Sequence, residues 1–388
     1  MKIAIINTLY APNKVGGAEK SVQALAENFS ALGNDIIVIC LGKEDVSYKL
    51  NGVTIYTVKI KNDYWPFDTA NKSSFEKLKW HLKDASNNKY NDFLHNLFLS
   101  YKPDVLFTNN ISGFSTKVWR TASNLNIKIV HTLRDYYLQC PKTTKFKGNL
   151  NCLTLCNDCK LLSLPKKKDS SKINYLIGIS NYILNDHIDK GYFNGVENEV
   201  IFNGFEIPEK KIPEKKNTNT FGFIGQVNES KGIELILESF SKISSSSWRF
   251  LIAGAVDEKY LKQLNKINSS VQIEYLGYMD SSKFFEMIDV LIVPSLWNEP
   301  FGRVVLESII NKKPVIASDK GGIPEILSNN KQFIFSPKVN ELTVLLEKII
   351  ANSNFLDEFK FENKYLEKFT IKNTVQKYLE VFNKIIRD

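Results

Sequence analysis

The sequence lacks any long apolar run, and this absence bears on where the chain is expected to reside. Its first residues, MKIAIINTLYAP, begin as an apolar stretch, but Asn7, Thr8 and Pro12 interrupt them and no small-residue cleavage site follows. Because neither a membrane-spanning helix nor an export signal is indicated, this stretch predicts a first buried strand. We expect a cytoplasmic protein, and peripheral contact with the inner face of a membrane is an open alternative.

Two signals for metal binding are also missing. The chain contains no Asp-x-Asp pair, and its five cysteines do not form the two C-x2-C pairs typical of a zinc site. Four cysteines nevertheless cluster as C-x11-C-x3-C-x2-C, at Cys140, Cys152, Cys156 and Cys159. Disulfides are disfavoured in a cytosolic chain, so the alternatives are a structural zinc site and unligated thiols.

Length and composition indicate a globular protein of two domains. The chain has 388 residues, of which 43% are hydrophobic and 24% are charged, and this length exceeds what one core usually supports. A net charge of +9 favours anionic partners such as phosphates, acidic glycans or a membrane face. Since the lysines are scattered, a solvated basic surface is a better interpretation than nucleic-acid binding.

Short apolar runs alternate with amphipathic stretches in both halves of the chain, which is typical of α/β domains built on parallel sheets. Residues 208–219, PEKKIPEKKNTN, have no apolar periodicity and predict a linker. We therefore expect two doubly wound, Rossmann-like domains, 1–207 and 220–370, that face each other across a cleft. Ligands bind such sheets beyond the carboxyl ends of the strands.

The stretch PSLWNEPFGRVVLES (294–308) carries two carboxylates between a strand and a helix. Pro300 favours an extended conformation at Glu299, which places Glu299 in a loop. Gly302 lets the backbone turn, and the residues after it have helical spacing, so Glu307 should lie about one and a half turns into a helix. The start of that helix can bind an anion through its unpaired amides.

Two further stretches have the pattern of a phosphate or sugar loop. FIGQVNESKG (223–232) follows a buried strand, with Gly225 at its end and Lys231 placed to reach a phosphate. In YAPNKVGGAEKSV (10–22), Gly16 and Gly17 stand just before a helical pattern. A glycine pair suits close approach to a ligand, and an ordinary tight turn explains it equally well.

Together these stretches resemble the retaining nucleotide-sugar glycosyltransferases of family four, which have the GT-B architecture. The resemblance covers essentially the full length and is carried by GGAEKSVQALAENFSALGNDIIVI, VIFNGFE, GQVNESKGIELILESF and VPSLWNEPFGRVVLESIINKKPVIASDKGGIPEIL. It implies transfer of a sugar from a nucleotide-diphosphate donor to a glycan or lipid-linked acceptor of a bacterial surface polymer. It also implies that catalysis needs no cofactor, and that the final helix, about 371–388, packs back on the first domain.

The resemblance assigns roles to the site residues. Glu299 orients the donor sugar, Lys231 stabilises the departing diphosphate, and Glu307 binds the ribose. The remaining donor-binding residues are Gly16, Gly17, Gly225, Gln226, Phe301, Gly302 and Arg303. Fixed donors and cations aimed at the phosphate would stabilise the charge that develops there as the bond to the sugar breaks.

Two departures from the family pattern affect catalysis. Gln226 stands where relatives have an arginine, so one fixed positive charge is missing. Arg134-Asp135 stands where many relatives have His-Asp. Arg134 is therefore one candidate for the role of that histidine and His131 is another, although a lone histidine in a strand is more often a core residue.

Two other functions remain open on the sequence alone. One is a GT-B nucleotide-sugar epimerase or hydrolase, which would turn over the donor without an acceptor. The other is a nucleotide-sugar-binding subunit that has lost catalysis. Gln226 and Arg134 favour this alternative, whereas the intact glutamate pair argues against it.

Overall fold

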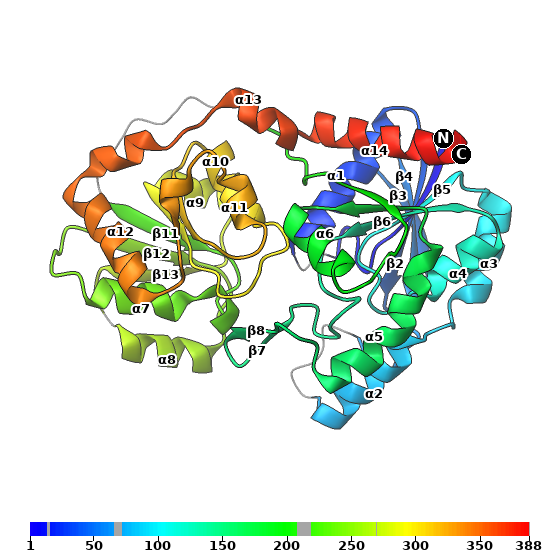
Figure 1. The fold of residues 1–388 in the computed structure, drawn as a ribbon, viewed down its shortest axis with the longest axis horizontal. Coiled ribbons are helices and arrows are strands. Elements are labelled where there is room, and N and C mark those ends of the chain that lie inside the picture. Colours follow the sequence, from blue (N-terminus) through cyan, green and yellow to red (C-terminus); the bar gives the residue numbers. More distant parts are fainter. Residues whose placement is uncertain (14–15, 66–71, 208–218, 269, 388) are drawn as a thin grey trace. The chain divides into compact units, whose positions relative to one another are not determined.

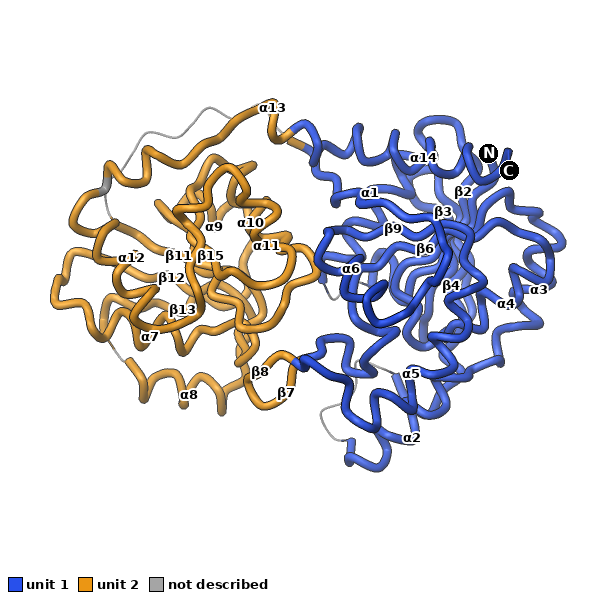
Figure 2. Tube along the Cα trace, in the orientation of Figure 1, with its two compact units in different colours: residues 1–145, 152–206, 367–388 blue, residues 146–151, 207–366 orange. Residues whose placement is uncertain are grey.

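The computed structural model describes residues 1–13, 16–65, 72–207, 219–268 and 270–387 (Figure 1). The chain divides into two compact units (Figure 2). Unit 1 comprises residues 1–145, 152–206 and 367–388, and unit 2 comprises residues 146–151 and 207–366. The predicted linker, apart from Asn219, lies outside the described residues. None of the described helices combines the length and apolar content needed to cross a membrane.

Unit 1 is built on an eight-stranded sheet in the order β10-β9-β6-β5-β1-β2-β4-β3. Its strands are parallel except for β3, which pairs antiparallel with β4. Their bounds are β1 Lys2–Ile6, β2 Asp35–Gly42, β3 Val46–Leu50, β4 Val53–Lys59, β5 Val105–Thr108, β6 Lys128–Leu133, β9 Tyr175–Gly178 and β10 Glu197–Val200. The central strands are buried on both faces, which explains why their sequences are continuous apolar runs.

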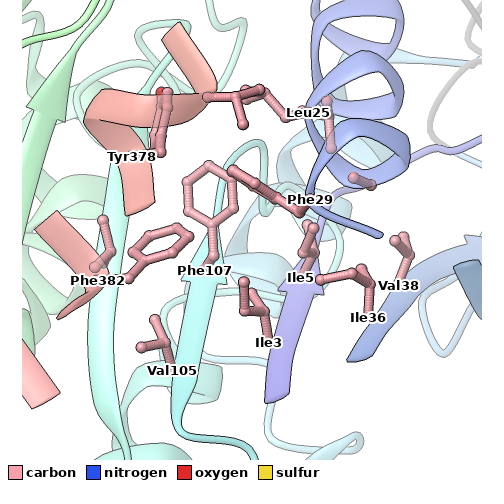
Figure 3. Close-up of a cluster of buried hydrophobic side chains, with 14 of the residues drawn as sticks. Ile3, Ile5, Leu25, Phe29, Ile36, Val38, Val105, Phe107, Tyr378 and Phe382 are labelled. Carbon is pink, nitrogen blue, oxygen red and sulfur yellow. The ribbon is translucent and has the colours of Figure 1, made fainter. Parts of the chain in front are cut away.

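Helices cover both faces of this sheet (Figure 1). They are α1 Gly17–Ala31, α2 Ser74–Ala85, α3 Asn91–Tyr101, α4 Lys117–Asn124, α5 Asn157–Asp169, α6 Asn181–Ile188 and α14 Ile371–Arg387. On one face, α1 and α14 pack over β1, β2 and β5 around a cluster of aromatic and aliphatic side chains (Figure 3). Phe107 of β5 lies 5.1 Å from the ring of Tyr378 and 5.5 Å from that of Phe382, so the last helix is an integral part of this core.

Unit 2 contains a six-stranded parallel sheet in the order β13-β12-β11-β14-β15-β16. The strands are β11 Thr220–Ile224, β12 Arg249–Ala253, β13 Ile273–Gly277, β14 Val290–Val293, β15 Val315–Ser318 and β16 Ile334–Phe335. The helices are α7 Ile233–Ser241, α8 Glu258–Ile267, α9 Ser281–Met287, α10 Arg303–Ile310, α11 Ile323–Ile326, α12 Val339–Ala351 and α13 Asn363–Leu366. Since β11 and β14 are neighbours, the loops that follow them meet at one edge of the sheet.

The structure differs from the predicted domain bounds at residue 207, which groups with unit 2, at residues 367–370, which group with unit 1, and at one internal segment. Residues 146–151 fall inside the predicted first domain, yet they group with unit 2 as a hairpin of β7 (Phe146–Lys147) and β8 (Leu150–Asn151). Gly148 and Asn149 both have positive φ, as a two-residue hairpin turn requires. The side chain of Asn151 bonds to the backbone of Leu296 and Asn298, which attaches the hairpin to unit 2.

Candidate active site

The loop between β14 and α10 has the predicted strand, loop and helix order. β14 ends at Val293 and α10 begins at Arg303, so Glu299 lies in the loop and Glu307 in the helix, four positions after its first residue. Gly302 caps α10 with φ +96°, a conformation that other residues rarely adopt. These three local predictions are confirmed.

Three donors converge on one oxygen of Glu299. Its Oε1 accepts hydrogen bonds from Lys231 Nζ at 2.6 Å, Ser295 Oγ at 2.8 Å and Trp297 Nε1 at 2.9 Å. The Lys231 ammonium also lies over the indole ring of Trp297, 5.0 Å from its centroid. Charged hydrogen bonds of this length hold a carboxylate in one orientation, so the lysine and glutamate predicted as catalytic residues form one polar cluster.

Backbone contacts fix the position of Glu299. Its carbonyl accepts from the Gly322 amide at 2.8 Å. A Cβ on Gly321 would lie 2.0 Å from the same carbonyl oxygen, so the loop after β15 can approach Glu299 this closely because position 321 is glycine. On the other side, the Leu296 amide donates to the carbonyl of Ser230 at 2.9 Å, which joins the Glu299 loop to the residue before Lys231.

The loop after β11 brings Lys231 to this point. The Gly225 amide donates to Ala253 at 3.0 Å, and a Cβ on Gly254 would lie 1.7 Å from the Gly225 carbonyl oxygen. The loops after β11 and β12 therefore pass in direct backbone contact at the edge of the sheet. The side chain of Gln226 is exposed beside them.

Arg303 and Glu307 form a second charged pair one helical turn apart on α10. Arg303 Nε donates to Glu307 Oε1 at 2.8 Å, and both side chains are about one quarter exposed, at 25% and 21%. Phe301, just before the helix, is buried, so its backbone and not its ring is available to a ligand. Both charged groups remain accessible from solvent next to the start of α10.

Gly16 and Gly17 lie in unit 1, at the beginning of α1. Gly16 is the N-cap of the helix, and its amide donates to Oε2 of Glu19 at 2.8 Å. Glu19 is itself buried. The glycine pair thus opens a helix as predicted, and its role in donor binding stays a prediction.

Arg134 follows β6 and is buried. Its Nε donates to Asn109 Oδ1 at 2.7 Å and its Nη1 donates to Asn203 Oδ1 at 2.6 Å. Two neutral amides therefore fix the guanidinium at the carboxyl end of the sheet, and they leave its positive charge in place. This geometry is compatible with the predicted role of a fixed cation.

His131 lies in the core, which argues against its predicted catalytic role. It is 3% exposed, stacks on Phe193 and meets the edge of Trp119, and its Nδ1 lies 2.9 Å from Thr108 Oγ1. Burial lowers the pKa of the imidazole to about 3, so the ring is neutral at physiological pH. We leave His131 out of the proposed catalytic set, because a ring enclosed in this way has no access to a ligand.

Beside Arg134, unit 1 buries a network of ionisable side chains that the sequence did not reveal. Burial raises the pKa of Asp135 to about 6 and lowers that of Lys166 to about 8. Lys166 Nζ donates to the carbonyl of Tyr137 at 2.9 Å, and the Tyr137 hydroxyl donates to Asp84 Oδ2 at 2.7 Å. Asp135 and Tyr137 follow β6 at the end of the sheet where ligands of such folds bind, whereas Lys166 comes from α5 and Asp84 from α2.

The clustered cysteines do not have the geometry of the predicted zinc site. None of the four forms a disulfide, and burial, together with the neighbouring thiols of Cys156 and Cys140, raises the pKa of Cys159. Within the described ranges, no group of three or more His, Cys, Asp or Glu side chains is arranged to hold a metal ion. This arrangement gives the zinc alternative no support, and a structural metal stays a prediction.

Sequence reasoning missed three residues that contact the Glu299 loop: Ser295, Trp297 and Asn151. Ser295 and Trp297 stand within four positions of Glu299, so their proximity was a usable signal. Asn151 carried no such signal, since 145 positions separate it from Leu296 in the sequence.

The fold has well-matched solved relatives. Sucrose-phosphate synthase from Thermosynechococcus elongatus superposes with a TM-score of 0.78 at 15% identity, covering 100% of this chain and 99% of that chain. Anabaena Alr3699/HepE, solved in complex with UDP, superposes with a TM-score of 0.71 at 16% identity, covering 99% and 100%. The chain therefore has the GT-B architecture of two Rossmann-like domains, and the predicted fold class is confirmed.

Sequence comparison establishes the family. Residues 205–365 match the model of the glycosyl transferases group 1. A 42.6 kDa protein in the cps region of Klebsiella pneumoniae is 34% identical over 330 residues, covering 84% of this chain and 87% of that one. A glycosyltransferase of Methanocaldococcus jannaschii is 24% identical over 381 residues, covering 92% and 90%. The chain belongs to the glycosyl transferases group 1 family and is a glycosyltransferase.

Proposed function

We propose that the protein transfers a sugar from a nucleotide-diphosphate donor to an acceptor with retention of anomeric configuration. The observation that carries this proposal is the convergence of Lys231, Ser295 and Trp297 on Oε1 of Glu299, at the carboxyl ends of β11 and β14. Glu299 orients the sugar from this fixed position. These residues lie within the segment that matches the family model, which supports placing the donor there.

Lys231 stabilises the departing diphosphate in this proposal. An ammonium has three donors, so Lys231 can keep its bond to Glu299 while donating to a phosphate oxygen. The amides at the start of α10 add donors, and Arg303 brings a second cation to the same helix end. This matters because Gln226 is uncharged where the family resemblance implies an arginine.

Glu307 binds the ribose of the donor. Its carboxylate is held by Arg303 on the accessible side of α10, and carboxylate oxygens accept readily from hydroxyl groups. Anabaena Alr3699/HepE, which shares the fold, was solved with UDP, and this makes a uridine nucleotide the first donor to test.

We further propose that the acceptor is a glycan or lipid-linked glycan of a surface polysaccharide. The support is the Klebsiella pneumoniae relative, which lies in a cps region. Arg134, held by Asn109 and Asn203, and the partly buried Asp135 are two charged groups of unit 1 that follow β6 at the carboxyl end of its sheet.

Thermal unfolding against a panel of nucleotide-sugars tests the donor site, because a ligand that binds the folded state alone raises the midpoint. At least one donor should stabilise the wild type, and Glu307→Ala should lose the shift. Glu274→Ala is the matched control, since Glu274 forms an exposed ion pair on β13 of the same unit. If no donor stabilises the wild type, the donor-site assignment fails.

We also propose that unit 1 contacts an anionic membrane surface through α2 and α5, which pack side by side (Figure 1). These helices and the segment before α5 expose six large apolar side chains: Phe75, Leu78, Leu82, Leu153, Leu161 and Leu164. Exposed lysines adjoin them at Lys79, Lys160 and Lys168. An apolar face flanked by cations fits the headgroup region of an anionic bilayer.

Co-sedimentation with vesicles tests this contact. We expect binding to vesicles containing phosphatidylglycerol, weaker binding to neutral phosphatidylcholine vesicles, and loss of binding in Phe75→Ser/Leu161→Ser. Val344→Ser is the control, because Val344 is an equally exposed apolar residue of α12. Equal sedimentation of the wild type and the double variant would contradict the proposal and would leave the donor site untouched.

A further inference from the structure

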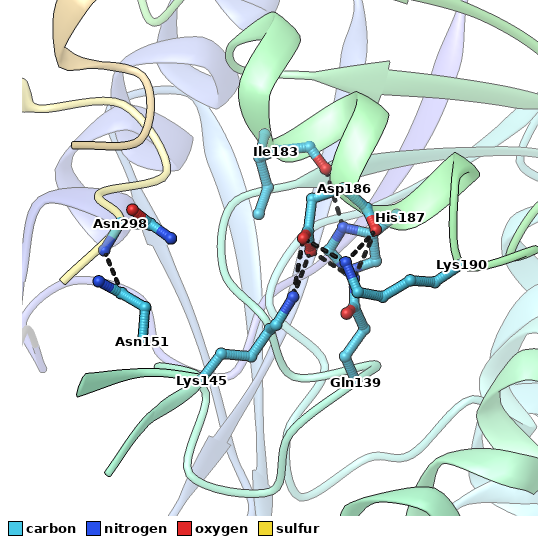
Figure 4. Close-up of polar contacts among 8 residues, drawn as sticks. All are labelled: Gln139, Lys145, Asn151, Ile183, Asp186, His187, Lys190 and Asn298. Carbon is cyan, nitrogen blue, oxygen red and sulfur yellow. Dashed lines mark hydrogen bonds and ion pairs between the residues drawn. The ribbon is translucent and has the colours of Figure 1, made fainter. Parts of the chain in front are cut away.

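The hairpin β7–β8, which we call the arm, groups with unit 2, although the residues before and after it group with unit 1. The chain leaves unit 1 after Lys145 and returns at Cys152, whose amide donates to the Lys145 carbonyl at 2.8 Å and so closes the base of the arm. The Lys145 ammonium donates to both carboxylate oxygens of Asp186 at 2.8 Å (Figure 4). The arm therefore starts from a base that is fixed within unit 1.

The two faces of the hairpin are different. Phe146 pairs with Asn151 and Lys147 pairs with Leu150, and paired residues project from the same face of a two-stranded ribbon. Lys147 and Leu150 are exposed, whereas Phe146 and Asn151 are partly buried. The face that carries Phe146 and Asn151 thus packs against the protein, and the face that carries Lys147 and Leu150 is exposed to solvent.

Asn151 forms hydrogen bonds to the backbone just before Glu299 through both the nitrogen and the oxygen of its side-chain amide. Its Nδ2 donates to the Leu296 carbonyl at 2.7 Å. Its Oδ1 accepts from the Asn298 amide at 2.8 Å (Figure 4). Between these two points lies Trp297, whose indole donates to Glu299. The two bonds therefore fix the segment that directs both Trp297 and Glu299.

Phe146, on the same face, reaches the neighbouring loop. It lines a cavity of about 490 Å³ together with Val227, Asn228 and Ser230, which precede Lys231. The hairpin thus touches both loops that carry the Lys231–Glu299 pair. Neither of these contacts follows from the sequence pattern of unit 2 alone.

We infer that Asn151 is a positioning residue for transfer: it holds the 296–298 backbone so that Glu299 meets the donor sugar in a single orientation. The catalytic meaning of this inference rests on the proposed function, whereas the structural part stands on the two hydrogen bonds. Because these two hydrogen bonds hold the segment, loss of both should loosen the loop measurably.

Amide hydrogen exchange of residues 294–302 tests the structural part without any ligand. In Asn151→Ala we expect exchange at Asn298 and its neighbours to rise about tenfold, as loss of one or two hydrogen bonds implies. Leu150→Ala, on the solvent face of the same hairpin, should leave this segment unchanged. Exchange in Asn151→Ala equal to that of the wild type overturns the inference.

Kinetics with the donor that stabilises the wild type test the catalytic part. Asn151→Ala should lower kcat about tenfold with little change in KM, because Glu299 would be misplaced relative to the reacting sugar. Asn151→Asp should recover part of the loss, since one oxygen can still accept from Asn298. A raised KM with unchanged kcat would refute positioning. If no donor binds the wild type, the proposed function fails, while hydrogen exchange still decides whether Asn151 holds the loop.

Discussion

The two sheets hold charged groups at their carboxyl ends in different ways. In unit 2, Lys231 and Glu299 are partly exposed and are fixed by short contacts to each other and to Ser295 and Trp297. In unit 1, Lys166 and its neighbours are buried, and burial itself shifts their pKa values. The difference suggests that the Lys231–Glu299 site of unit 2 can receive an anion from solvent, whereas in unit 1 burial sets the protonation of the charged groups.

The largest effect should come from the exposed pair of unit 2. Lys231→Ala removes the cation proposed to stabilise the leaving diphosphate and one donor to Glu299, so kcat should fall by about 100- to 1000-fold. Initial rates with the donor that stabilises the wild type measure this loss. Lys283→Ala, at an exposed lysine of α9, should retain full activity. Wild-type rates in Lys231→Ala would remove Lys231 from the mechanism.

The buried network of unit 1 should instead control stability. Lys166→Met keeps the bulk of the side chain but leaves the buried Asp84 carboxylate without a neighbouring cation, which should cost about 3 kcal/mol. Chemical denaturation measures the loss, and Lys166→Met/Asp84→Asn should recover part of it. If the double variant is no more stable than the single one, the two groups are not coupled.

His131 offers a test in which pH is the variable. Its folded pKa of about 3 lies below the unfolded value of about 6.5, so the folded state binds fewer protons between these limits. Stability contributed by the neutral ring is present above about pH 6.5 and is lost as the pH falls toward 3. Relative to His131→Gln, the wild type should lose about 2 kcal/mol between pH 7 and pH 5. Parallel curves for the two proteins would show that the ring is not held neutral.

The smallest effect is expected at an exposed ion pair of unit 2. Arg249 Nη2 lies 3.2 Å from Glu274 Oε2, but both side chains are more than half exposed, at 60% and 53%. Solvent screens such a pair, so Arg249→Ala should change the free energy of unfolding by less than about 0.5 kcal/mol. A loss comparable to that of Lys166→Met would show that exposure does not separate the two regions.

Local signals predicted the Glu299 loop well. Pro300 and Gly302 determine where the loop ends and α10 begins, and these are properties of two residues and their neighbours. Equally local signals were overlooked at the hairpins. Asn51-Gly52 joins β3 to β4 and Gly148-Asn149 joins β7 to β8, each with two positive φ angles, as the two-residue turn of a hairpin demands.

The sequence by itself determined the fold class and identified Lys231 and Glu299 as site residues. Apolar periodicity, proline and glycine act over a few positions, and these signals can be read in one dimension. The tertiary structure alone decided that His131 is a core residue and that Asn151 forms hydrogen bonds to the backbone before Glu299. Burial and contacts between distant segments arise when the chain packs, and no short stretch of sequence encodes them.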